Sequence, residues 1–411
     1  MKFAYLLVFI IAVSLQTPSA NAEPATNSII SSADHIKVLK KQVDDAHAAY
    51  TATNDASGKL WDAYYHLNDT NLPRIFELAK KDPASETAFE AFAWIVTNRR
   101  ISVRSLRPFG HQSVEFLRDF HTTNSDIGEV CRQLGNLWDP GDQAAIDFLR
   151  IASEKNPDRN ARGYATFALG QKLKQKAEAL AFFPLEPPST NQWWLQAKAE
   201  YQEEIQKTDV KTLSAEAEQL FEAVLAKYAD CPTPLHQGIR QPKAKLDEEA
   251  KVELYELNHL MTGKVAPEIA GKDIDGNNLK LSQYRGDVVV LSFWASWCGP
   301  CMQMIPLERA LTERFKGQPF TLLGVNGDGS TNDAKHAMQK EEVSWPSFWN
   351  QGGPNGTISD AWNVHGWPTV YVLDPDGIIR LKFEGYGSIS TSNLLSGTVD
   401  RLLMEFQHRK K

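Results

Sequence analysis

Hydrophobic positions between about residues 36 and 261 recur at intervals of three and four, which predicts a helical region. One example is the run that ends just before Pro157, in which the apolar side chains share one helical face. The pattern is clearest in four segments rich in alanine, leucine, glutamate and lysine: 87–100, 142–155, 161–180 and 212–230.

Three of the predicted helix ends look alike, because each has an apolar stretch, a lysine and then a proline. The prolines are Pro83, Pro157 and Pro232, which are spaced at almost equal intervals. This spacing resembles pairs of tetratricopeptide-type units, whereas the segment 156–170 resembles a HEAT-type repeat. We therefore interpret the region as a stack of helical hairpins, with an irregular helical bundle as the alternative.

The pattern changes at Gly263 to alternating strand and helix signals. A near-continuous apolar run at 287–295 predicts a strand buried on both faces. Predicted hairpins at 266–284 and 369–383 flank it in sequence, and an amphipathic helix closes the chain. The fold class is therefore multidomain, with a mostly α-helical, tetratricopeptide- or HEAT-like N-terminal region and an α/β C-terminal domain whose mixed sheet is covered by helices.

The first 22 residues have the features of an export signal. Lys2 precedes a short apolar stretch at 3–15, and "ANA" at 20–22 offers a small-residue cleavage site before Glu23. An uncleaved membrane anchor is the alternative, although the apolar stretch is short for a span. We expect a periplasmic or otherwise extracytoplasmic protein made of five segments: signal peptide 1–22, flexible tail 23–34, helical domain 35–230, linker and connecting helix 231–262, and α/β domain 263–411.

Composition narrows the classes of function. Apolar residues make up 42% and charged residues 23% of the 411 residues, as in soluble globular proteins. A formal net charge of −7 gives no reason to expect a nucleic acid partner. Four cysteines are too few for a disulfide scaffold. Two of them, Cys131 and Cys231, could form a long-range bridge or remain separate thiols.

The other two cysteines define the candidate chemistry. Cys298 and Cys301 lie in "SWCGPC", directly after the predicted buried strand. This position places Cys298 in the first turn of a helix, where unpaired N–H groups and the helix dipole favour a thiolate. Pro300 is tolerated there. We expect an exposed nucleophile, Cys298, and a shielded resolving thiol, Cys301, one turn deeper.

Other readings of the same pair are weaker. A zinc site needs a second ligand pair, and Cys131 and Cys231 have no matching spacing. A structural bridge between such close neighbours closes almost no loop. We therefore expect no metal and no organic cofactor, with the Cys298–Cys301 disulfide itself as the redox centre.

From about residue 265 onward the sequence resembles the thioredoxin fold, and within it the TlpA/ResA branch of exported thiol–disulfide oxidoreductases. Pro306 and three stretches carry the resemblance: "APEI", "DIDGNNLKLSQYRGDVVVLSFWASWCGPC" and "VHGWPTVYVLDPDGII". It implies that Pro368 is cis and faces the dithiol, in a loop on which substrate backbone docks. Core packing is the alternative role for Trp367. The implied substrate surface comprises Trp297, Gly299, Pro300, Gly366, Trp367, Pro368 and Thr369.

The sequence departs from this family at the proton acceptor. Thioredoxins carry a buried aspartate where this chain has Ser292, and the TlpA/ResA branch has a glutamate where it has Met304. Glu308 and His365 are the candidate proton-handling residues that remain, although both types of residue usually lie on the surface. We predict that the dithiol works without a dedicated buried carboxylate.

The Gly-Pro pair between the cysteines matches thioredoxin, whose potential is about −270 mV, and this predicts a reductase or reducing relay. The resemblance implies apocytochrome or other exported protein thiols as substrates, with electrons delivered by a membrane or extracytoplasmic donor. A peroxiredoxin is one rival, but the sequence lacks its P-x-x-x-T-x-x-C site. The second rival is a scaffold whose helical region binds a protein while the C-terminal domain is passive.

Overall fold

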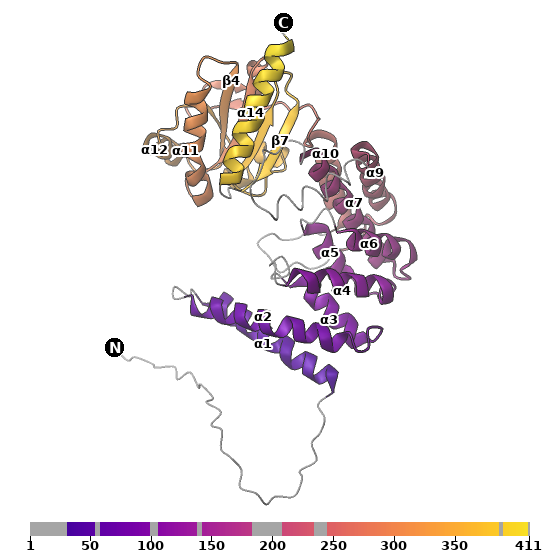
Figure 1. Ribbon diagram of the computed structural model, residues 1–411. Helices are drawn as coiled ribbons and strands as arrows, with labels where there is room; N and C mark the ends of the chain where they lie inside the picture. The colour runs from indigo at the N-terminus through magenta and orange to yellow at the C-terminus, as the bar shows by residue number, and fades with distance from the viewer. Residues whose placement is uncertain are drawn as a thin grey trace, which may run out of the picture.

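A computed structural model describes residues 31–53, 58–98, 106–137, 142–182, 208–233, 245–385 and 389–409 of the chain (Figure 1). The predicted signal peptide, residues 23–30 of the predicted tail and residues 234–244 of the predicted linker lie outside these residues. Among the described helices, none combines the length and the apolar character that crossing a membrane requires.

The N-terminal region is helical, as predicted. Several of its helices begin at a polar residue whose side chain accepts a backbone N–H, including Ser31, Ser85, Asp142 and Asp209. Figure 1 shows the helices stacked one after another along the chain. The helices are α1 (Ser32–Ala52), α2 (Lys59–Ala79), α3 (Glu86–Thr97), α4 (Arg107–Phe120), α5 (Gly128–Asn136), α6 (Gln143–Lys155), α7 (Arg159–Phe182), α9 (Val210–Lys227) and α10 (Leu246–His259).

One continuous hydrophobic core runs from Ile36 in α1 to Met261 after α10. Cys131 in α5 and Cys231 after α9 are both buried free thiols, so the structure does not contain the long-range bridge. Burial raises the pKa of each of these two thiols. Neither cysteine is therefore ready to act as a nucleophile near neutral pH.

The C-terminal domain is built on a five-stranded mixed sheet in the order β5-β4-β3-β6-β7, and a separate β1–β2 hairpin precedes it. The central strand, β3, pairs in parallel with β4 and antiparallel with β6. The strands are β1 (Ala270–Lys272), β2 (Asn278–Lys280), β3 (Val288–Trp294), β4 (Phe320–Asn326), β5 (Ser347–Trp349), β6 (Thr369–Leu373) and β7 (Ile379–Glu384). This arrangement confirms the predicted mixed sheet.

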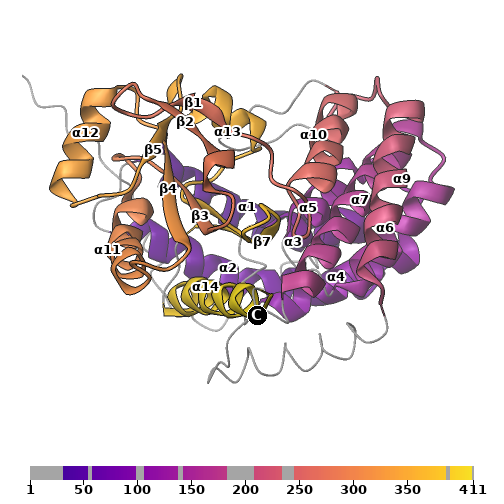
Figure 2. The ribbon, with the colours of Figure 1, turned by 90° about the horizontal axis from the view of Figure 1, so that it is seen from above.

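Every residue of β3 is buried, as the apolar run predicts. Alternate side chains enter two separate cores, with Val290 on one face of the sheet and Leu291 on the other. Figure 2 shows α11 and α14 on one side of the sheet and α13 on the other. The helices of this domain are α11 (Gly299–Arg314), α12 (Thr331–Lys340), α13 (Thr357–Ala361) and α14 (Ile389–Arg409), with short 3-10 turns at Leu281–Tyr284 and Gly353–Asn355.

A buried cluster of charges joins the helical region to the sheet. Glu256 of α10 forms ion pairs with Lys174 of α7 and with Lys382 of β7, and it accepts a hydrogen bond from the amide of Asn363 at 3.1 Å. Lys174 also pairs with Glu253 at 2.5 Å. Burial acts to raise the pKa of Glu256, but the two lysine charges outweigh it and hold that pKa below its ordinary value. The cluster therefore connects β7 to α7 and α10 through ion pairs, in which each buried charge is compensated by its partners.

Candidate functional site

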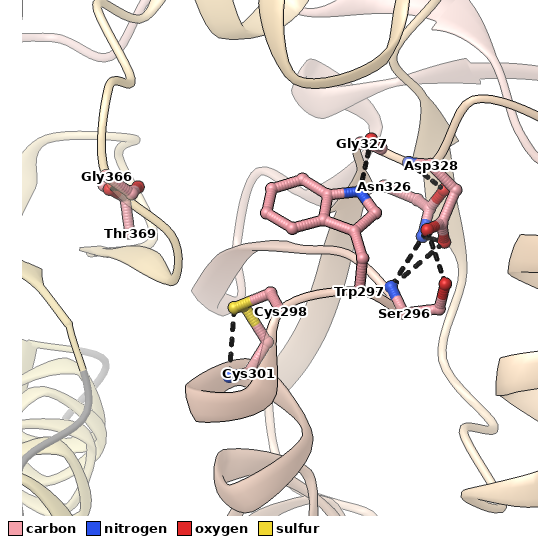
Figure 3. The surroundings of a disulfide bond; sticks show 9 residues. All are labelled: Ser296, Trp297, Cys298, Cys301, Asn326, Gly327, Asp328, Gly366 and Thr369. Carbon is pink, nitrogen blue, oxygen red and sulfur yellow. Dashed lines mark hydrogen bonds between the residues drawn. A yellow bond between two sulfur atoms is a disulfide. The ribbon is translucent and has the colours of Figure 1, made fainter. Parts of the chain in front are cut away.

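The dithiol lies where β3 passes into α11. Cys298 is the N-cap residue of α11, and its Sγ accepts the N–H of Cys301 at 3.1 Å (Figure 3). Gly299 and Pro300 follow as the first helical residues, at a position where proline removes no helical hydrogen bond. Cys298 and Cys301 form a disulfide with an S–S distance of 2.05 Å. The two sulfur atoms thus lie at the positive end of the helix dipole.

The prediction of an exposed first cysteine was wrong for this disulfide form. Cys298 is 4% exposed and Cys301 is 2% exposed. The reason is tertiary packing, because both cysteines belong to a buried cluster that also contains side chains of β6 and α14. Trp297, in contrast, is 54% exposed. The accessible group beside the disulfide is therefore an indole ring.

The second part of the site is the loop that leads into β6. The Trp367–Pro368 peptide bond is cis, as the resemblance implied. Thr369 donates its hydroxyl to the carbonyl of Gly366 at 2.7 Å, which closes the loop on itself. Figure 3 shows Gly366 and Thr369 on a loop across from Cys298.

Trp367 combines both roles considered for it. Its ring packs against Phe293 in the core, with 6.3 Å between the ring centroids. It also makes an edge contact with the exposed Trp297, with 5.8 Å between the centroids. It remains partly exposed. The two tryptophans therefore bring the "SWCGPC" loop and the cis-proline loop together.

A third segment, which sequence reasoning missed, lies at the end of β4. The Asp328 carboxylate accepts hydrogen bonds from the backbone N–H of Ser296 at 3.0 Å, from its hydroxyl at 2.7 Å and from the amide of Asn326 at 2.8 Å (Figure 3). Between these residues, the carbonyl of Gly327 accepts the indole N–H of Trp297 at 3.3 Å. One feature of the sequence could have revealed this segment, namely the polar residues that follow the predicted strand of β4. The ends of parallel strands lie at the same edge of a sheet, so residues after β4 must lie near the dithiol that follows β3.

The structure also corrects the expected location of Glu308, one of the two candidate proton-handling residues. Glu308 is 1% exposed, not a surface residue, and its Oε1 has no hydrogen-bond partner among the described residues. Burial raises the pKa of Glu308 to about 7, against a smaller opposing effect of the Ser292 hydroxyl. Met304 of α11 and Ser292 of β3 are also buried, whereas His365 is exposed. The hydrophobic core behind Cys301 thus contains a carboxyl group after all.

Comparison with known proteins agrees with this geometry. Residues 262–382 match the family described as the AhpC/TSA family. The thiol–disulfide oxidoreductase ResA of Bacillus thuringiensis subsp. konkukian is 26% identical over 123 residues, which are 30% of this chain and 69% of the relative. ResA of Bacillus subtilis is 29% identical over 115 residues, 28% of this chain and 63% of the relative.

Among solved structures, the thioredoxin domain of a thiol–disulfide oxidoreductase from Bacteroides vulgatus is similar at 29% identity and a TM-score of 0.32. The match covers 35% of this chain and 99% of that one. The AhpC/TSA match and the mixed sheet make the C-terminal part of this chain a thioredoxin-like domain, and the curated relatives named above are thiol–disulfide oxidoreductases. Both of these relatives are named ResA, and the helical region of this chain lies outside the family match.

Proposed function

We propose that this protein is an exported thiol–disulfide oxidoreductase that reduces protein disulfides through Cys298 and Cys301. The observation that carries the proposal is the Cys298–Cys301 disulfide at the N-terminus of α11, across from a cis-proline loop. A disulfide in this setting can be reduced and formed again repeatedly, because the helix N-terminus stabilises the Cys298 thiolate that each cycle produces.

The reaction begins with the reduced dithiol. The Cys298 thiolate attacks one sulfur of a substrate disulfide, forms a mixed disulfide and releases the other substrate sulfur as a thiolate. Cys301 then loses its proton and attacks the Cys298 sulfur, which releases the second substrate thiolate. Two electrons have passed to the substrate, and the Cys298–Cys301 disulfide has formed. An extracytoplasmic donor that supplies two electrons must then reduce it again.

The second step needs an acceptor for the proton of Cys301, and Glu308 is suited to this role. It lies seven residues after Cys301 in α11, so the two side chains share one helical face two turns apart. Side chains on a helix lean toward its N-terminus, which directs the carboxyl of Glu308 toward the dithiol. A buried carboxylate with an unpaired oxygen and a pKa of about 7 can accept a proton at physiological pH.

We expect Glu308→Gln to slow the resolving step about 10²-fold at pH 8, the lower end of what a positioned base contributes. In the wild type, the rate of this step should rise through about pH 7 as Glu308 ionises. Because the folded-state pKa is above the ordinary value of 4.5, stability should also fall as pH rises from about 4.5 to about 7. Stopped-flow decay of the mixed disulfide and thermal denaturation at several pH values measure the two effects.

The matched control is Glu313→Gln, which changes an exposed carboxylate on the same helix. Its kinetics and pH profiles should equal those of the wild type. If Glu308→Gln has the wild-type profile, exchange proceeds without a buried carboxylate, as the sequence alone had led us to predict.

Reduction of insulin disulfides by the reduced protein, together with a measured potential, tests the function. We expect activity and a potential close to that of thioredoxin, about −270 mV. A potential above about −180 mV would assign the protein to the oxidising or isomerising side. Export of the intact precursor is tested separately, by sequencing the N-terminus of the mature protein, which we expect to begin at Glu23.

Two other functions make different predictions. The first is a peroxiredoxin-type peroxidase, but none of the four cysteines in the sequence has threonine three residues before it, as the peroxidase site requires. A peroxide-consumption assay should therefore give no turnover. A binding scaffold would show no insulin reduction in either the wild type or a Cys298→Ser variant, and its helical region would retain a bound protein.

A further inference from the structure

We propose that Asp328 is a positioning residue for disulfide exchange. It holds Trp297 and Cys298 in the position, opposite the cis-proline loop, that the reaction requires. This inference rests on the proposed function and goes beyond the dithiol and its proton acceptor. Asp328 follows β4, lies outside both loops that contact substrate in the proposal, and is 1% exposed. Its effect on the reaction must therefore pass through the residues it binds.

Asp328 holds the backbone just before the dithiol. Its Oδ1 accepts the Ser296 N–H at 3.0 Å and the Ser296 hydroxyl at 2.7 Å, and its Oδ2 accepts the Asn326 amide at 2.8 Å. Asn326 in turn accepts the N–H of Asp328 at 3.1 Å, which fixes the carboxylate in place. Three donors from two segments thus converge on one buried carboxylate, and two of them belong to Ser296, which lies two residues before Cys298.

Gly327 connects the same segment to both tryptophans. Its N–H donates to the carbonyl of Trp294 at 2.9 Å, and its carbonyl accepts the indole N–H of Trp297. A Cβ at Gly327 would lie 2.4 Å from the ring of Trp367, so only glycine leaves room for that ring. The segment 326–328 therefore contacts both the "SWCGPC" segment, called the dithiol loop, and the cis-proline loop.

The chemistry explains why a carboxylate is needed. All three groups that point at Asp328 are donors, and an ionised carboxylate offers only acceptors. An asparagine at this position would place an NH₂ group against at least one of these donors. Asp328→Asn therefore keeps the size of the side chain but replaces one of its two acceptor oxygens with a donor. The hydrogen bonds that hold the Ser296 backbone against the end of β4 are then no longer all satisfied.

The test compares two reactions of Cys298: insulin reduction, which requires a protein substrate to be aligned with the thiolate, and alkylation by a small reagent, which does not. We expect Asp328→Asn to lower kcat/KM for insulin reduction about 10-fold or more, since small misplacements of reacting groups can cost up to about 10²-fold. The rate at which iodoacetamide alkylates reduced Cys298 should change less than about 2-fold, because a small reagent needs no docking surface. Asp333→Asn, at an exposed carboxylate in α12, is the control and should leave both rates unchanged.

Equal losses in both reactions would overturn the proposal, because Asp328 would then act on the thiolate itself. Unchanged insulin reduction in folded Asp328→Asn would overturn it as well. If Asp328→Asn does not fold, Gly327→Ala keeps the carboxylate and displaces Trp367, and it should give the same divergence between the two reactions; unchanged insulin reduction in this variant would overturn the proposal. Absence of insulin reduction in the wild type would instead reject the proposed function on which the inference rests.

Discussion

Replacing Cys298 with serine should reduce insulin reduction to the uncatalysed rate, because a serine hydroxyl is not ionised near neutral pH and cannot attack a disulfide sulfur. The buried free thiols Cys131 and Cys231 should not compensate, since burial raises the pKa of both. Turbidity of the released insulin chains measures the rate. Activity close to that of the wild type would show that another thiol carries the reaction.

The companion variant Cys301→Ser should accept a substrate sulfur on Cys298 and fail to release it. The mixed disulfide then accumulates, and its mass identifies the bound protein. The double variant Cys298→Ser/Cys301→Ser is the matched control and should capture nothing. Capture by the double variant would place the reactive thiol elsewhere in the chain.

Replacing Lys382 with methionine should lower the free energy of unfolding by about 3–5 kcal/mol, because it leaves part of the buried charge of Glu256 uncompensated. The expected structural consequence is that the helical region and the C-terminal domain separate into two unfolding transitions. Chemical denaturation followed by circular dichroism and by tryptophan fluorescence measures both effects.

Lys316→Met is the control for Lys382→Met, because Lys316 is exposed and its ion pair with Glu313 lies on the surface. It should change the free energy of unfolding by less than about 0.5 kcal/mol. Adding Glu256→Gln to Lys382→Met should recover part of the loss, since the uncompensated carboxylate is then removed. A loss of equal size in the control and the Lys382 variant would show that the buried cluster has no special role.

Local features of the chain were enough to predict the centre of the site. A continuous apolar run predicts a strand buried on both faces, and its direct passage into "SWCGPC" places Cys298 at a helix N-terminus. These predictions held because they depend on residues that are neighbours in sequence. The cis bond at Pro368 was implied by resemblance and is present.

Contacts between distant segments could not be predicted in the same way. Ser296 and Asp328 are 32 residues apart, and Glu256 and Lys382 are 126 apart. The helical period places Glu308 on the face of Cys301 but does not show whether a sheet covers that face. Burial is decided by what packs against a residue, and in this domain the packing buries Glu308 completely.

The sequence by itself determined the two-part architecture, the strand-to-helix junction and the position of the dithiol, because hydrophobic period and helix capping act over a few residues. Only the tertiary structure decided three other features: the near-complete burial of Cys298, the pKa of about 7 for Glu308 and the grip of Asp328 on the dithiol loop. Each of these depends on desolvation or on hydrogen bonds across the sheet, which arise when distant segments pack together.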